Sequence, residues 1–104
     1  MPEYMFAYHG GTIPETQEEG ERAMAAWGKW FEDMGKAVVN GGHPVGQSMT
    51  VTASGVAGNG GANPISGFTI VQADTPEEAC EMAKGCPMVA DGSGSVEVAP
   101  VIEM

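Results

Sequence analysis

The chain has 104 residues and a formal net charge of -10, from 14 acidic and 4 basic side chains. This length fits one domain spanning residues 1–104, with room for a single modest core. The negative charge argues against nucleic acids and anionic membrane surfaces as partners, because lysine and arginine supply most of the affinity for both.

The first residues have no basic flank, and their apolar stretch is too short for a signal peptide or a membrane span. We therefore expect a cytoplasmic protein. Residues 4–9 predict a short strand that ends at Gly10-Gly11 and alternates between an aromatic face and a second, mostly apolar face that includes His9. The aromatic face comprises Tyr4, Phe6 and Tyr8.

A long helix is predicted to begin at Thr16, whose hydroxyl can cap it while Glu19 completes a capping box, and to end at Gly35. Apolar residues recur along it at helical spacing, and this stripe predicts the core face. The stripe comprises Met24, Trp27, Phe31 and Met34. Trp30 lies off its centre, so we expect it to be partly exposed, to cover a sheet edge or to meet a partner chain.

The middle of the chain is predicted to be β structure. Residues 37–40 form a short strand before Gly41-Gly42, and residues 49–54 alternate as a half-exposed edge strand does. Residues 55–67 are rich in glycine and predict a mobile hairpin connection. They predict no phosphate loop, because a following helix and a lysine with serine or threonine are missing.

The C-terminal third predicts a strand, a helix and a second strand. Residues 68–73 are rich in side chains that favour β-strands. Thr75 is the predicted N-cap of the helix, Pro76 occupies its first position, and the helix ends at residues 85–87. Residues 95–101 then form the last strand. Cys80 and Cys86, at the end of this helix, are expected to stay reduced, since their spacing suits neither a disulfide nor a zinc site.

This order of elements predicts an α+β fold of the ferredoxin-like β-α-β-β-α-β type, an antiparallel sheet with both helices on one face. Residues 68–71 and 96–102 carry apolar side chains at both parities of the strand. The face without helices should therefore also be covered, most simply by the same sheet of a second copy. We expect a homodimer.

Six segments share their pattern with one known family. They are Tyr4–Gly11, Met24–Phe31, Val38–Gly42, Ser66–Val71, Ala83–Pro87 and Gly94–Val98. Together they resemble the YCII-related proteins, whose members form dimeric α+β barrels. The chain is most similar to an uncharacterised bacterial subgroup in which Asn-Pro-x-Ser-Gly, here Asn63–Gly67, precedes the strand before the last helix.

The sequence departs from this family at two points. Residues 60–64 stand where a larger branch has Asp-Gly-Pro-Phe, and residues 16–34 hold no histidine, whereas a better-studied branch has one on its first helix as part of a His-Asp pair. The resemblance therefore implies the fold and the dimer, and no catalytic residue carries over from it.

Two histidines are the candidate catalytic residues. His9 ends a strand, where imidazole can act as an acid or base near neutral pH, and His43 lies in a rigid turn between Gly42 and Pro44. A structural hydrogen bond for His9 and a solvated turn for His43 are the alternatives. Aspartates such as Asp74 could complete a metal site, but no short ligand spacing exists. We predict no metal and no cofactor.

Several other residues are candidates for ligand binding. Asn40 and Ser66 stand next to glycines at strand margins, where a ligand can approach the backbone, although turn hydrogen bonds explain them equally well. An apolar pocket between helix and sheet can be walled by Tyr4, Trp27, Phe31 and Phe68. Core packing is the alternative for these four. The resemblance implies a small aromatic or lactone ligand for such a pocket.

Three functions stay open on the sequence. The first is an enzyme that acts on a small ring compound without a cofactor, with His9 as acid or base and His43 assisting it. The second is a non-catalytic module that binds a metabolite or a partner protein. The third is a homodimer with a structural role alone.

Overall fold

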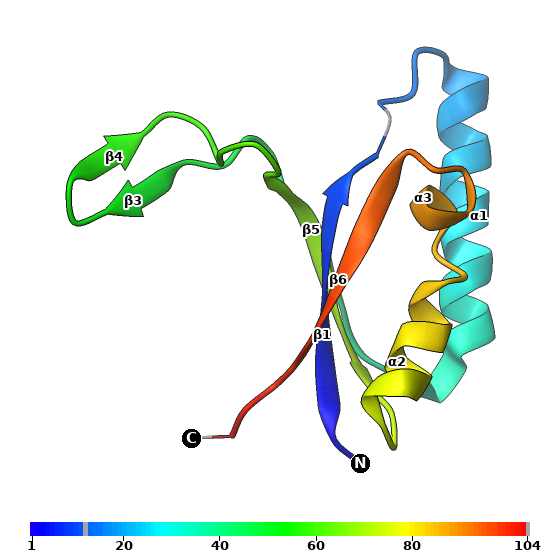
Figure 1. The fold of residues 1–104 in the computed structure, drawn as a ribbon. Coiled ribbons are helices and arrows are strands. Elements are labelled where there is room, and N and C mark those ends of the chain that lie inside the picture. Colours follow the sequence, from blue (N-terminus) through cyan, green and yellow to red (C-terminus); the bar gives the residue numbers. More distant parts are fainter. Residues whose placement is uncertain (12, 104) are drawn as a thin grey trace.

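A twisted antiparallel sheet carries all the long helices on one of its faces (Figure 1). This arrangement is seen in a computed structural model that describes residues 1–11 and 13–103. Its elements follow the chain as β1 (Glu3–Gly10), α1 (Gln17–Met34), the 3-10 helix η1 (Gly35–Ala37), β2 (Val38–Pro44), β3 (Thr50–Thr52), β4 (Gly55–Ala57), β5 (Ile65–Gln72), α2 (Pro76–Ala83), α3 (Pro87–Ala90) and β6 (Gly94–Pro100).

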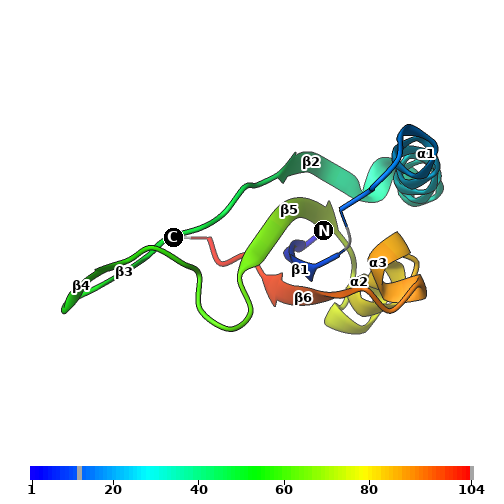
Figure 2. The same cartoon turned by 90° about the horizontal axis from the view of Figure 1, so that it is seen from above.

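The main sheet has the strand order β2-β5-β1-β6, and each neighbouring pair is antiparallel. The two crossovers, β1-α1-β2 and β5-α2-β6, place α1 and α2 on the same side of the sheet (Figure 2). This topology confirms the predicted ferredoxin-like fold with helices on one face.

Both predicted helix starts are present. The Thr16 hydroxyl accepts a hydrogen bond from the Glu19 amide at 3.1 Å, and the Thr75 hydroxyl accepts one from the Glu78 amide at 3.2 Å. α1 also ends at Gly35, whose φ of 53° suits glycine. Among the described helices, none is long and apolar enough to cross a membrane.

The core lies between the aromatic face of β1 and the helices. Phe6 and Val71 are fully buried, and the Phe6 ring stacks on Trp30 with 6.1 Å between centroids. The predicted place of Trp30 is therefore wrong, because only 5% of this residue is exposed. Met24 was expected in the core and is 77% exposed. The other three residues of the predicted stripe, Trp27, Phe31 and Met34, do pack against the core, and Trp30 lies there with them in place of Met24.

The middle of the chain differs from the prediction. Residues 49–54 contain β3, but β3 is not an edge of the main sheet. It pairs with β4, which lies inside the stretch predicted as a hairpin connection. We call residues 45–64 the arm. It projects from the side of the sheet opposite α1 and α2 (Figures 1 and 2). Residues 37–40 are likewise the start of a longer strand, β2, and α3 follows α2 as a separate short helix.

The second face of the sheet carries no helix and is mostly apolar. Side chains alternate along a strand, so Met5 and Ala7 face away from Phe6 and Tyr8. The register pairs them with Ile70 and Phe68 on the neighbouring strand, whose side chains share this face. We call it the open face and define it by Met5, Ala7, Phe68, Ile70 and Ala99. These residues confirm that apolar side chains lie on both faces of the sheet.

Candidate functional site

A cavity of about 580 Å³ lies between α1 and the ends of β1, β2 and β5. Its lining holds no lysine, arginine, aspartate or glutamate. The side chains and backbone around it come from Tyr8, Gly10, Gly11, Ile13, Pro14, Trp27, Phe31, Gly41, Gly42, His43, Pro44, Ser66, Gly67, Phe68, Thr69 and Met88. The site is therefore neutral and largely apolar, inside a chain that is strongly negative.

Aromatic rings form one wall of the cavity. The Trp27 ring meets the Tyr8 ring edge-on at 5.1 Å between centroids and lies 6.2 Å from the Phe31 ring. Trp27 also contacts Trp30 edge-on at 5.5 Å, so the core behind it holds its orientation. Rings fixed in this way present a rigid apolar surface that suits a flat molecule.

Glycines let the backbone approach closely around the cavity. Gly42 has a φ of 70°, and a Cβ atom there would collide with the Phe68 carbonyl. At Gly67 a Cβ atom would lie 3.1 Å from the His43 carbonyl oxygen and 3.3 Å from Tyr8 Cδ2. Glycine at these two positions therefore allows the segments that border the cavity to approach one another closely.

We expect Gly42→Ala to destabilise the protein by about 2 kcal/mol, since alanine is strained at a positive φ and its methyl group meets a carbonyl. Urea unfolding of the variant and the wild type measures this. Gly41→Ala is the matched control, because a Cβ atom at Gly41 meets nothing within 4 Å. Equal stability of all three proteins would contradict the strained geometry of β2.

A buried chain of hydroxyl groups crosses the sheet beside the cavity. The Tyr8 hydroxyl donates to Thr69 Oγ1 at 2.7 Å, and Thr69 Oγ1 donates to the Gly41 carbonyl at 3.0 Å. Burial is the main cause that raises the pKa of Tyr8 well above its ordinary value of 10.0, and the hydrogen bond to Thr69 offsets only part of this. Tyr8 therefore keeps its proton and acts as a neutral donor.

Tyr8→Phe should cost about 1 kcal/mol of folding free energy, because it removes one buried hydrogen bond and leaves the Thr69 bond to Gly41 in place.

The raised pKa of Tyr8 should also make the stability of the wild type depend on pH. Above pH 10 the unfolded chain loses this proton before the folded chain does, so the wild type should lose stability as the pH rises from about 10 to 11. Urea unfolding at pH 8 and pH 11 should show a smaller loss for Tyr8→Phe, and equal losses would contradict the assignment.

Two polar side chains at the cavity come from the predicted site. Ser66 Oγ is buried, and among the described residues it has no hydrogen-bond partner. His43 is exposed at the end of β2, with its ring 6.4 Å from the Phe68 ring. A ligand in the cavity can thus be met by one buried hydroxyl and one imidazole.

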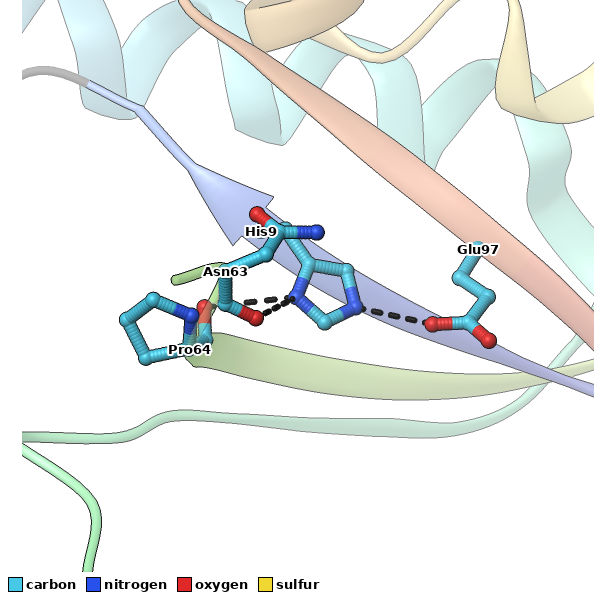
Figure 3. Close-up of polar contacts among 4 residues, drawn as sticks. All are labelled: His9, Asn63, Pro64 and Glu97. Atoms are coloured by element: carbon cyan, nitrogen blue, oxygen red, sulfur yellow. Dashed lines mark hydrogen bonds and ion pairs between the residues drawn. The ribbon is translucent and has the colours of Figure 1, made fainter. Parts of the chain in front are cut away.

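His9 belongs to the opposite face of the sheet, because it follows Tyr8 along β1. Its Nδ1 atom lies 3.0 Å from the Asn63 carbonyl oxygen and 3.2 Å from that of Pro64, and its Nε2 atom lies 2.9 Å from Glu97 Oε1 (Figure 3). All three partner atoms are oxygens that accept hydrogen bonds, so both ring nitrogens are engaged and the orientation of the ring is held from both sides. This side chain is 13% exposed, whereas that of Glu97 is 70% exposed.

The structure divides the predicted site residues between four places. The cavity is lined by Trp27, Phe31, His43 and Ser66, and also by Phe68, although strand alternation places the Phe68 side chain on the open face. Tyr4 lies in the core, His9 lies on the other face, and Asn40 Oδ1 accepts a hydrogen bond from the Gly42 amide at 2.9 Å. Of the two predicted catalytic histidines, His43 thus lines the cavity and His9 lies on the opposite face of the sheet.

Sequence reasoning left several cavity residues out of the candidate set. Tyr8 and Thr69 were treated only as strand residues, and Met88 belongs to the unexpected helix α3. The repeated glycines at positions 10–11 and 41–42 were the available signal, because each marks a close approach of the backbone. Within residues 1–11 and 13–103, no group of three or more His, Cys, Asp or Glu side chains could hold a metal ion.

The sequence pattern of the YCII-related domain matches residues 4–104. This chain belongs to the YCII-related family. Among curated proteins, none matches this YCII-related protein. A solved structure with a similar fold is 5-chloro-2-hydroxyhydroquinone dehydrochlorinase (TftG) from Burkholderia phenoliruptrix AC1100, in complex with 2,5-dihydroxybenzoquinone. It is 18% identical, the match covers 96% of this chain and 95% of that one, and the TM-score is 0.57.

Proposed function

We propose that this YCII-related protein binds a small, uncharged, flat ring compound in the cavity beside Trp27. The observation that carries the proposal is the cavity itself, with a rigid aromatic wall, glycines around it and no charged lining residue. Its volume of about 580 Å³ is within the range of small-molecule sites. The fold shared with a protein that was solved with 2,5-dihydroxybenzoquinone supports the same class of ligand.

The Ser66 hydroxyl indicates which polar group this ligand should carry. A buried hydroxyl without a partner costs free energy, and a ligand that supplies a hydroxyl or carbonyl group recovers it. The ligand should therefore carry at least one oxygen substituent, as phenols, quinones and lactones do.

Proton transfer to or from the bound ring is the finer proposal, and His43 is the group that we assign to it. It is the one histidine that lines the cavity, whereas both nitrogens of His9 are occupied by acceptors. Imidazole can act as acid or base at neutral pH without a cofactor.

Binding without a reaction is the second candidate, and the composition of the cavity favours it. Apart from His43, the titratable side chain in the lining is Tyr8, whose raised pKa keeps it protonated. No second acid or base is thus placed there to complete a proton relay, within the part of the chain that the structure describes. Turnover by the wild type that His43→Ala abolishes would favour the enzyme.

We further propose that the protein is a homodimer whose protomers meet through the open face. The side chains that define this surface are apolar and no helix lies over it, while Glu97, opposite Ala7 on the same face, pairs with His9 at 2.9 Å. Burial against the same face of a second copy would remove these apolar side chains from water.

A thermal-shift screen of phenols, quinones, lactones, aromatic acids and divalent metals tests the ligand class. A compound at 100 times its dissociation constant stabilises the folded state by about 2.7 kcal/mol, which corresponds to a shift of roughly ten degrees in a domain of this size. We expect neutral oxygen-bearing rings to give the largest shifts and charged acids and metals to give small ones.

Matched variants locate the binding. Trp27→Ala should lose the shift, whereas Met24→Ala, on the exposed side of the same helix, should keep it. Ser66→Ala should reduce it, and His9→Ala should leave it unchanged. A shift that survives Trp27→Ala and disappears in His9→Ala would contradict this site.

A further inference from the structure

The arm is a small hairpin that lacks a core of its own. β3 and β4 pair over three positions, Thr50–Ala57, Val51–Val56 and Thr52–Gly55. Val51 is 74% exposed and Val56 is 68% exposed. A two-stranded hairpin of this length is at best marginally stable in water, so it needs a surface to pack against.

The side chains of the arm divide into two faces. Val51 and Val56 oppose each other and share one face, while the threonines of β3 share the other. Thr50 Oγ1 donates to the Asn59 carbonyl at 2.8 Å, so the threonine side is occupied by bonds within the arm. The valine face is the one left for an external surface.

The charge pattern restricts what that surface can be. Residues 45–64 contain no charged side chain, in a chain with 14 acidic and 4 basic residues. Two copies of a protein with a net charge of -10 repel each other, so contacts between copies must use uncharged parts of the surface. The arm is one such part, and the apolar residues that define the open face are another, with Glu97 beside them paired to His9. The arm lies on the side of the sheet away from α1 (Figures 1 and 2).

The base of the arm is fixed to the sheet at both ends. The Val45 amide donates to the Ser66 carbonyl at 3.0 Å, and His9 Nδ1 donates to the carbonyls of Asn63 and Pro64 (Figure 3). Gln47 Nε2 also donates to the Gly58 carbonyl at 3.2 Å across the hairpin. Hydrogen bonds thus attach the base of the arm to the sheet, while β3 and β4 beyond it are left to pack against another surface.

We propose that the arm of each protomer packs its Val51–Val56 face on a second copy of this chain, beside the contact between the two open faces. This inference rests on the homodimer of the proposed function. A two-fold axis through the open face places the second copy on the side to which the arm projects. Each protomer would then hold its partner with one arm, and His9 would act as a positioning residue for the arm.

Three proteins test the arm separately from the open face: the wild type, the double variant Val51→Ser with Val56→Ser, and the control Ala57→Ser on the other face of the arm. Sedimentation equilibrium gives each dimer dissociation constant. We expect the double variant to dissociate at least about tenfold more readily and the control to match the wild type. Hydrogen exchange should show that the amides of residues 50–57 lose protection on dilution to monomer.

Each result decides one point. A monomeric wild type at high concentration would overturn both the homodimer and the arm contact. A dimer whose dissociation constant is the same in the double variant, with arm amides that exchange freely, would overturn the arm contact and leave the open-face dimer. Loss of affinity in the double variant while Ile70→Glu stays dimeric would support the arm and remove the open-face contact. Unchanged melting temperatures of the monomers exclude a folding effect.

Discussion

Ile70→Glu should convert the proposed homodimer into a monomer. The side chain of Ile70 lies on the open face opposite Met5, so the variant would place one carboxylate from each protomer in the contact. An uncompensated buried charge costs several kcal/mol, and no lysine or arginine belongs to the open face. We expect the dimer dissociation constant to rise by about a thousandfold or more.

Light scattering coupled to size-exclusion chromatography measures the mass in solution. Met24→Glu is the matched control, because it adds the same charge at an exposed position of α1. It should leave the mass of the dimer unchanged. A dimeric Ile70→Glu protein would show that the open face is not where the protomers meet.

Phe6→Ala should lower the free energy of unfolding by about 3–5 kcal/mol, the usual cost of removing a buried phenylalanine ring. Phe6 is fully buried and stacks on Trp30, so the cavity left behind has rigid walls on both sides. Urea unfolding gives the value. Val101→Ala, at a residue that is 43% exposed, should cost less than about 1 kcal/mol. A loss below that for Phe6→Ala would mean that the core is centred elsewhere.

The helix starts and the fold class were predictable because their signals are local. Thr16 and Thr75 each cap a helix with their own hydroxyl, and the residues three positions later complete the motif. The order of strands and helices then limits the sheet to few topologies, and the one predicted is present.

Helix orientation was not predictable from spacing alone. Two stripes of α1, one through Met24 and one through Trp30, both follow the helical period. The stripe through Trp30 faces the core because Phe6 stacks on its ring and the Met82 carbonyl accepts its indole N–H at 2.9 Å. Both contacts come from residues far away in the sequence, so they leave no local signal.

Strand alternation explains why the two histidines lie in different parts of the structure. Tyr8 and His9 are consecutive in β1, so their side chains must lie on opposite faces of the sheet. Since α1 covers the aromatic face, His9 belongs to the open face and His43 alone reaches the cavity. The arm had no such signal, because its strands pair with each other and their sequence resembles that of an edge strand.

An NMR titration of the uniformly ¹⁵N-labelled protein tests the ligand site most directly, with the ring compound that gives the largest shift in the thermal screen. If the cavity is the site, the amides of Gly41, Gly42 and Gly67 and the indole N–H of Trp27 should move together and saturate at one dissociation constant. Residues 50–57 in the arm should stay in place. Shifts confined to the surroundings of His9 and Glu97, with the Trp27 signal unmoved, would contradict the account.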